Sequence, residues 1–256
     1  MAADDVTITA ARFADEARTV IDRVVAANKD SVAAAARVLA DCVAADGVVQ
    51  AFGTGHSQAT ALEIAGRAGG LIPTNRIGLS DLVIRGGDDV SVLSDPLLER
   101  SPGLGKRLYE LAGPHPRDVF VVISNSGVNN SIVDFALHVK EAGHPLIALT
   151  SLKHTWSVPA RHASGKRLAA LADVVLDNGA PTGDALLPLP DGGSLCGIST
   201  ITSALLVQMA VAEAVGLMTA EGHQAPVYVS ANVPGGFERN LVLERHYGER
   251  LHRGGF

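Results

Sequence analysis

The sequence predicts an α/β fold, a doubly wound and mostly parallel sheet flanked by helices. Short apolar runs alternate with longer helical patterns along most of the 256 residues, and this alternation is typical of parallel sheets. The hydrophobic fraction is 47% but the aromatic fraction is only 4%, so the core must consist mainly of Ala, Val, Leu and Ile. That composition suits parallel strands covered by Ala-rich helices.

The expected elements divide the chain into an N-terminal helical arm, residues 1–46, and an α/β domain, residues 47–256. We expect the arm to be helical from Thr7 to Ala45, with a break near Asn28. The expected strands are Val48–Phe52, Arg76–Leu79, Val119–Ile123, Pro145–Thr150 and Val174–Asp177. The expected helices are Ser57–Ala68, Leu104–Ala112, Asn129–Ala142, Gly165–Leu171 and Ser199–Leu217. A long loop at 80–102, a turn-rich segment at 179–193 and an irregular tail from 222 complete the chain.

Composition excludes several classes of function. The net charge is −6 and no basic run is present, so we expect no nucleic-acid partner. Cys42 and Cys196 lie in apolar sequence, which favours a reduced interior and a cytoplasmic location. The N-terminus lacks a signal-peptide layout, and the apolar run Ala204–Met218 is too short and too polar for a membrane span. With no CxxC or HExxH pattern, we expect no metal and no cofactor.

Two loops of small residues each follow an apolar strand and precede a helix. The first is Gly-Thr-Gly-His-Ser at 53–57 and the second is Ser-Asn-Ser-Gly at 124–127. Glycine allows close approach of the backbone, amides at a helix N-terminus attract anions, and hydroxyls add donors. Ligands of doubly wound sheets bind at the carboxyl ends of the strands, so these loops predict a site for a phosphorylated small molecule. The expected binding residues are Gly55, Ser57, Ser124, Asn125, Ser126, Gly127, Asn129, Thr150 and Ser151.

The two loops do not fit the common nucleotide-binding motifs. The segment Gly53-x-Gly55 lacks the third glycine of a dinucleotide fingerprint, and no GxxxxGK[ST] motif is present. Ser and Asn at a helix start also suit ordinary capping. The matching loop at Ser57 favours phosphate binding over capping alone.

Three residues are candidates for catalysis. Glu63 lies about two turns into the helix after the first loop, among apolar neighbours that would raise its pKa, as a proton-shuttling base requires. The alternative is an ordinary surface or interface carboxylate. His56 follows Gly55 directly and would contact the ligand, and His223 after the last helix is a candidate acid or base. We expect His144 at the surface.

The two strand–loop–helix units together resemble the SIS (sugar isomerase) domain, over roughly Gly47 to Leu217. Residues 52–57 resemble its first phosphosugar loop, and residues 124–127 resemble its second loop, which cradles the phosphate in that family. Residues 62–67 are similar to the segment of phosphoheptose isomerases that carries a catalytic glutamate. The chain looks most like a stand-alone phosphosugar-binding group within the family.

The chain also departs from the family pattern. Many SIS domains have Ser or Thr two residues after the glycine of the second loop, where this chain has Asn129. Phosphoheptose isomerases place a histidine in the last helix, but here that helix offers only Gln208 and Glu213. Arabinose-5-phosphate isomerases have histidine before Pro-Gly-Gly, where this chain has Val233.

The resemblance implies that the chain binds a phosphorylated sugar, as an aldose–ketose isomerase that uses a carboxylate base. The alternatives are a non-catalytic phosphosugar sensor and an etherase or lyase acting on an amino-sugar phosphate. We also expect a homodimer or higher homo-oligomer, because the arm and the last helix have more apolar surface than one sheet face covers. A second subunit would then be able to lend residues near His223 to the site.

Overall fold

The computed structural model describes residues 8–252 and contains a five-stranded parallel sheet. The sheet order is β2-β1-β3-β4-β5, as in flavodoxin-like doubly wound folds. The predicted α/β class is therefore confirmed. The strands are β1 (Val49–Gly53), β2 (Thr74–Ile77), β3 (Val119–Ile123), β4 (Leu146–Thr150) and β5 (Val174–Asp177).

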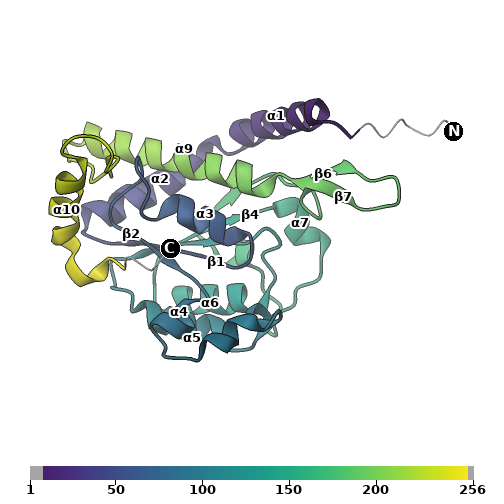
Figure 1. Ribbon diagram of the computed structural model, residues 1–256, viewed down its shortest axis with the longest axis horizontal. Helices are drawn as coiled ribbons and strands as arrows, with labels where there is room; N and C mark the ends of the chain where they lie inside the picture. Colours follow the sequence, from purple (N-terminus) through teal and green to yellow (C-terminus); the bar gives the residue numbers. More distant parts are fainter. Residues whose placement is uncertain (1–7, 253–256) are drawn as a thin grey trace.

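Helices cover both faces of this sheet (Figure 1). One face carries α1 (Ala10–Ala27), α2 (Lys29–Ala44), α3 (Ser57–Ile64) and α9 (Ser199–Ala220). The other carries α4 (Asp81–Ile84), α5 (Leu104–Ala112), α6 (Asn130–Glu141) and α8 (Leu168–Leu171). Successive residues of β3 alternate between two buried apolar clusters, with Val121 on the α9 face and Phe120 on the α6 face. Because both faces are covered, the central strand β3 is apolar throughout.

The expected break in the N-terminal arm is confirmed at Asn28, between α1 and α2. The Asn28 amide donates to the backbone oxygens of Val24 at 2.8 Å and Asp177 at 2.9 Å. It also accepts from the backbone amide of Asp177 at 2.9 Å. The amide therefore pairs with both backbone groups of the last residue of β5, which is an edge strand. This contact anchors the arm to the domain of its own chain.

Several boundaries differ from the expectation. The helix after the first loop ends at Ile64 rather than Ala68, because Ala65 is extended and Gly66 has a φ of +76°. The 80–102 loop contains α4 and two 3-10 turns, Val90–Ser94 and Leu98–Arg100. Three further elements were not expected: α7 (Leu152–Ser157) and the hairpin of β6 (Ala185–Pro188) and β7 (Ser194–Gly197).

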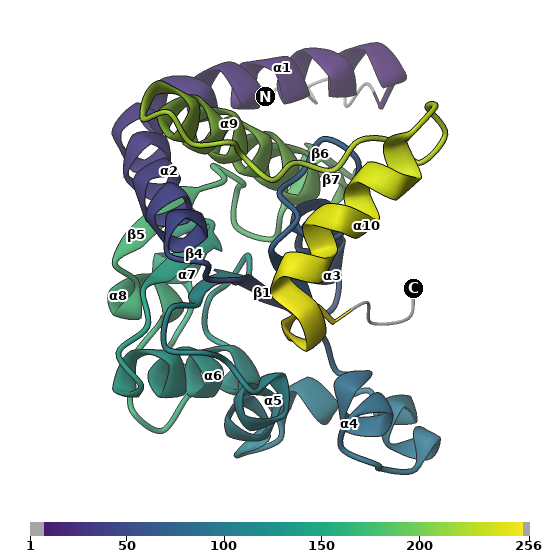
Figure 2. The ribbon, with the colours of Figure 1, turned by 90° about the vertical axis from the view of Figure 1, so that its left-hand side faces the viewer.

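The tail was expected to be irregular, and this was wrong, because it contains α10 (Gly236–Tyr247). Figure 2 shows α10 crossing in front of β1 and α3. Only Gly236, Asn240 and Tyr247 of α10 are buried, so its sequence has no apolar stripe that would reveal a helix.

Polar contacts fasten the segment after α10 to the sheet. Arg250 forms an ion pair of 2.7 Å with Asp118, whose side chain is 3% exposed. The same carboxylate accepts from the amides of Val48 at 2.9 Å and His115 at 3.0 Å and from the Gln50 side chain at 3.0 Å. Asp118 therefore joins the start of β1, the start of β3 and the tail.

The tail also lies along β2, the other edge strand of the sheet. The Asn75 side chain donates to the backbone oxygen of Arg250 at 2.8 Å and accepts from the amide of His252 at 2.8 Å. One asparagine amide thus stands at each edge of the sheet.

The expected surface position of His144 was wrong. This side chain is buried between the backbone oxygen of Asp118, 2.9 Å from Nδ1, and the hydroxyl of Tyr109, 3.1 Å from Nε2. Both ring nitrogens have partners, so His144 joins the start of β3 to α5.

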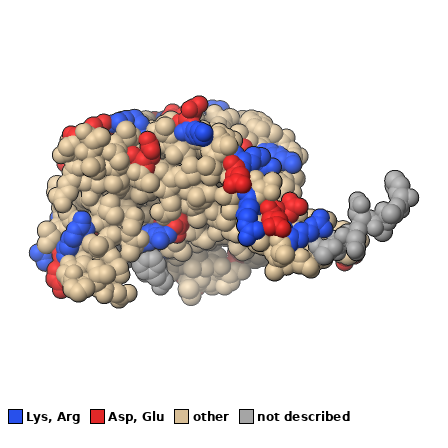
Figure 3. Space-filling model, turned by 90° about the horizontal axis from the view of Figure 1, so that it is seen from above, with Lys and Arg blue, Asp and Glu red and all other residues tan. Residues whose placement is uncertain are grey.

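The helix expected over Ser199–Leu217 is α9, which extends to Ala220, and the expectation that its apolar run is too short and too polar for a membrane span was wrong. By length and composition α9 would suffice to cross a membrane, but Leu206, Ala210 and Ala214 are buried against the rest of the chain, as in a core helix. Seen from the side that carries α9 and α1, the molecule shows scattered groups of charged side chains with a broad uncharged area between them (Figure 3).

Candidate functional site

The two small-residue loops begin side by side at the carboxyl edge of the sheet. Gly53, the last residue of β1, is paired with Ile123, the last residue of β3. Neighbouring strands β1 and β3 lie where the order of the sheet reverses, which is where ligands bind in folds of this kind. Ser57 opens α3 and the second loop leads into α6, so two helices begin at this edge, one on each face of the sheet.

A polar pocket of about 100 Å³ lies between these loops and the start of α9. Two of the expected binding residues, Ser57 and Asn125, line it together with His56. The remaining lining residues are Thr60, Ile123, Asn178, Asp184, Ser199, Thr200 and Ser203. The pocket is thus rich in hydroxyl and amide groups.

The second loop has a shape that requires glycine at 127, where φ is +62°. A side chain there would also lie 3.1 Å from the Thr155 hydroxyl and 3.2 Å from the Thr150 hydroxyl. The Ser124 hydroxyl accepts from the Gly127 amide at 3.1 Å, and the Thr155 hydroxyl donates to the Ser126 backbone oxygen at 2.9 Å. The loop is therefore fixed by its neighbours, while the Ser126 side chain is half-buried and takes no part in fixing it.

Thr150 and Ser151 have a different place from the one expected. Both are fully buried. Thr150 bonds to the Asn125 backbone oxygen at 3.2 Å, and Ser151 donates to the Ala180 backbone oxygen at 2.7 Å. Their hydroxyls support the loops from within, and neither residue lines the pocket. Gly55 is exposed in the first loop with a φ of +55°.

Sequence reasoning missed two lining residues, Asn178 directly after β5 and Ser203 in the second turn of α9. The Asn178 side chain donates to Asn125 Oδ1 at 3.1 Å and to the Ser203 hydroxyl at 3.3 Å. These bonds orient the Asn125 amide, whose Nδ2 lies 3.3 Å from His154 Nδ1. No local motif marks Asn178 or Ser203, because the chain brings them together only by folding.

Asp184 was also missed, although it brings a carboxylate to the pocket. Its φ is +73°, an uncommon conformation for a residue other than glycine. The carboxylate accepts from the Ser199 amide at 2.7 Å and from the Ser199 hydroxyl at 2.8 Å. Asp184 therefore compensates the free amides at the start of α9.

Glu63 lies on α3 but does not line this pocket. Gln208 of α9 donates to Glu63 Oε1 at 2.7 Å, and Arg67 forms an ion pair with the same carboxylate. The side chain is 24% exposed. The apolar shielding expected around Glu63 is thus replaced by an amide donor and a guanidinium.

The candidate histidines lie at opposite ends of α9. His56 is exposed beside the pocket. His223 lies beyond the other end of this 22-residue helix, near Asp46 and His246. Such a helix is about 33 Å long, so a single chain does not bring His223 to the pocket.

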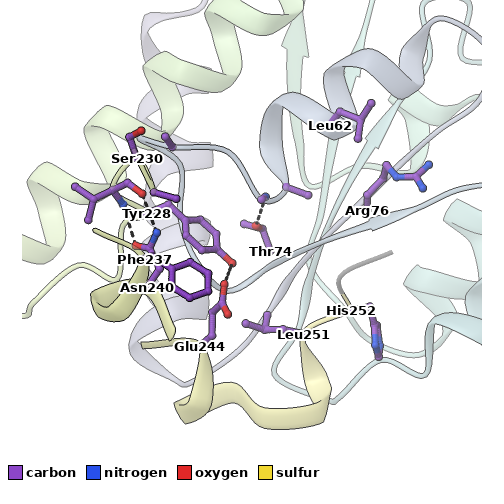
Figure 4. A pocket seen from close by; sticks show the side chains of 15 residues that line it. Leu62, Thr74, Arg76, Tyr228, Ser230, Phe237, Asn240, Glu244, Leu251 and His252 are labelled. Atoms are coloured by element: carbon purple, nitrogen blue, oxygen red, sulfur yellow. Dashed lines mark hydrogen bonds between the residues drawn. The ribbon is translucent and has the colours of Figure 1, made fainter. Parts of the chain in front are cut away.

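A second and larger cavity of about 310 Å³ lies between the last turn of α3, β2 and α10 (Figure 4). Leu62, Arg76 and Phe237 contribute to its lining, and the Tyr228 hydroxyl donates to Glu244 at 2.8 Å beside it. The cavity shares no lining residue with the pocket at the sheet edge. None of the expected binding residues reaches it.

Groups of three or more His, Cys, Asp or Glu that could hold a metal ion are not found within residues 8–252. The chemistry that the pocket offers therefore rests on hydroxyls, amides, one imidazole and one carboxylate. These groups suit a polar ligand that carries hydroxyl groups.

The parallel sheet, with two small-residue loops side by side at its carboxyl edge, places the protein among the doubly wound α/β proteins. Residues 12–151 match the profile of the SIS domain, and the chain belongs to this family. It is 39% identical to a UPF0309 protein of Listeria monocytogenes, over 93% of this chain and 97% of that protein. It is also 34% identical to a UPF0309 protein of Geobacillus kaustophilus, over 90% and 91% of the two chains.

A solved structure with a similar fold is a phosphoheptose isomerase from Francisella tularensis, with a TM-score of 0.55. The two sequences are 16% identical, and the matched region covers 79% of this chain and 94% of the isomerase chain. At this identity the likeness concerns the fold.

Proposed function

We propose that this protein binds a phosphorylated sugar, with the phosphate between Ser57 and the segment 124–129. The observation that carries the proposal is the pairing of Gly53 with Ile123, which starts the two loops side by side. The helices α3 and α6 follow these loops. The amides of Ser57, Gln58 and Ala59 at the start of α3 donate to carbonyls of the first loop, whereas the first amides of α6 have no partner within the helix. Membership of the SIS domain family supports the same ligand class.

The size of the pocket suggests how the ligand lies. Pockets for small molecules usually measure about 300–1,000 Å³, whereas this one measures about 100 Å³. With the phosphate on the segment 124–129 beside it, the nearest carbons would occupy this pocket, and the rest of the sugar would extend past the exposed His56. Phosphate binding would then orient carbons that lie outside the pocket.

The proposed reaction is an aldose–ketose isomerisation with Glu63 as the base. The carboxylate would remove a proton from the carbon next to the carbonyl, giving an enediol, and would return it to the neighbouring carbon. Arg67 and Gln208 hold the carboxylate in place. His56 would contact a sugar hydroxyl and assist ring opening, and His223 would contribute only from a second subunit.

Two alternatives remain part of the proposal. Gln208, which faces Glu63 at 2.7 Å, cannot act as an acid or base, and this favours a phosphosugar sensor without turnover. An etherase or lyase acting on an amino-sugar phosphate would use the same phosphate site.

In each case we propose a cytoplasmic homo-oligomer that packs through the apolar side of α9, where Ile201 is 44% exposed.

The test is a thermal-shift screen of sugar phosphates, each compared with the same sugar without phosphate. A ligand at about 100 times its Kd adds roughly 2.7 kcal/mol of stability, which raises the midpoint of unfolding by several degrees. Each stabilising sugar phosphate is then incubated in deuterated water. Exchange of a carbon-bound proton supports the isomerase, whereas binding without exchange or cleavage supports the sensor. If no sugar phosphate stabilises the protein more than its parent sugar, the proposal is wrong.

A further inference from the structure

Asn129 lies between a carboxylate and a guanidinium that come from two distant segments. Its Nδ2 donates to Glu99 Oε1 at 3.1 Å, and its Oδ1 accepts from Arg161 Nη1 at 3.3 Å. Glu99 belongs to the second 3-10 turn of the 80–102 loop, and Arg161 lies between α7 and α8. Although Asn129 occupies the cap position of α6, its side chain makes no capping bond. The amide is therefore directed outward, toward these two charged groups.

Neither charged group is neutralised by an ion pair. Within residues 8–252, no oppositely charged side chain lies within 4.0 Å of Glu99 or of Arg161. Arg161 is exposed and Glu99 is half-buried. A guanidinium that forms no ion pair thus lies beside the first turn of α6, where the helix amides also favour an anion.

We propose that Arg161 is a phosphate-binding residue of this site, and that Glu99 competes with the phosphate for the Asn129 amide. The inference rests on the proposed phosphate site at 124–129 and deepens it. In the free protein, the Glu99 carboxylate accepts the Asn129 donor. When a phosphate binds, the Asn129 amide turns to it and Arg161 supplies two parallel N–H donors and a positive charge.

The arrangement gives the two charged residues opposite effects on affinity. Removing the charge of Arg161 removes a charge-assisted contact, which we expect to raise Kd for a phosphate ligand about tenfold. Removing the charge of Glu99 weakens the acceptor that competes for Asn129 and removes a nearby like charge, so Kd should fall severalfold. A purely structural role for either side chain would not produce changes of opposite sign.

Trp156 provides the readout, since it is the single tryptophan of the chain. The neighbouring residue, Thr155, bonds to the Ser126 backbone oxygen at 2.9 Å, and the Arg167 guanidinium lies 5.1 Å from the centre of the Trp156 ring. Its emission should therefore respond to a ligand in the loop. Titrations use inorganic phosphate and a hexose 6-phosphate at constant ionic strength, with calorimetry as a second measurement.

The variants are Arg161→Gln and Glu99→Gln. Each is compared with a control variant that removes a charge of the same sign at another position. Lys166→Gln removes a positive charge from the Arg161 segment, and Glu110→Gln removes a negative charge from the exposed side of α5. We expect weaker binding in Arg161→Gln, partial recovery in Arg161→Lys, tighter binding in Glu99→Gln, and Kd within twofold of wild type in both controls.

The outcomes separate this inference from the proposed function. If Ser126→Ala weakens phosphate binding but Arg161→Gln behaves like Lys166→Gln, Arg161 is not a phosphate ligand and the proposed site stands. Weaker binding in Glu99→Gln would overturn the competition and show that Glu99 positions Asn129. If the wild-type protein binds neither probe, the proposed phosphate site itself is wrong.

Discussion

Gln208 of α9 donates a hydrogen bond of 2.7 Å to the carboxylate of Glu63 on α3. Arg67, one turn further along the chain, pairs with the same carboxylate. The orientation of the Glu63 carboxylate is therefore set by the neutral amide of Gln208 on α9 and by the guanidinium of Arg67, which follows α3. In the proposed isomerisation, this orientation would fix the place at which the carboxylate takes up and returns the proton.

Glu63→Gln keeps the shape of the side chain and removes the base. We expect kcat to fall by about 10²–10⁴ with binding little changed, measured as solvent deuterium exchange into a bound sugar phosphate. Glu213→Gln on the exposed side of α9 is the control. Exchange that persists in Glu63→Gln would assign the base to another residue.

Ser126→Ala should weaken phosphosugar binding by about 1 kcal/mol or more, the value of one lost charge-assisted bond. Stability should not change, because the loop is held through the Ser126 backbone oxygen and the Ser124 hydroxyl. Ser124→Ala should lower both affinity and stability, because the Gly127 amide loses its acceptor. Calorimetry and chemical unfolding separate the two effects, and unchanged affinity in both variants would contradict the phosphate site.

Asp118→Asn should destabilise the fold by about 3 kcal/mol, because Arg250 and three further donors lose a buried carboxylate. The measurement is the free energy of unfolding in urea. Asp15→Asn, which breaks an exposed ion pair with Arg18, is the control and should change this free energy by less than about 1 kcal/mol. Equal losses in both variants would show that the tail contact contributes little.

The two cysteines should differ sharply in reactivity. Burial raises the pKa of the Cys42 thiol to about 12, whereas Cys196 is exposed. At pH 8 a thiol reagent should therefore modify one cysteine in the native protein and both in denaturant. Rapid modification of two native thiols would show that α2 opens easily.

The same thiol predicts how stability depends on pH. In the unfolded chain Cys42 ionises near its ordinary pKa, but in the folded protein it keeps its proton up to about pH 12. The folded state therefore binds more protons in this range, and the free energy of unfolding should fall as pH rises above about 8.5. Unfolding curves of Cys196→Ser and of Cys42→Ala in that background measure the contribution. A steeper loss in the variant without Cys42 would contradict it.

A homodimer or larger assembly is expected at micromolar concentration, because the start of α9 exposes the apolar side chain of Ile201. Sedimentation should show a mass of at least twice 26.4 kDa. Ile201→Lys places a charge on this surface and should shift the protein toward the monomer. Wild-type protein that sediments as a monomer would refute the expectation.

Local sequence predicts the sheet well and the site only in part. The strand Val119–Ile123 was predicted without error because its apolar run reflects burial on both faces. The place of Asp184 and Asn178 in the pocket could not be predicted, because it depends on how α9 and β5 approach the loops. Thr150 and Ser151 were expected at the ligand for their chemistry, yet the direction of a side chain at a strand end is set by tertiary packing.

Asn28 and Asn75 have a consequence for the behaviour of the molecule in crowded solution. The outermost strands of an open sheet present free backbone groups to which a strand of another molecule can add, and fibrils grow in this way. At one edge the Asn28 amide already occupies the backbone donor and acceptor of Asp177, and at the other Asn75 holds the chain's own tail alongside β2. Two short amide side chains therefore protect the sheet against edge-to-edge polymerisation, and loss of either would show first as aggregation.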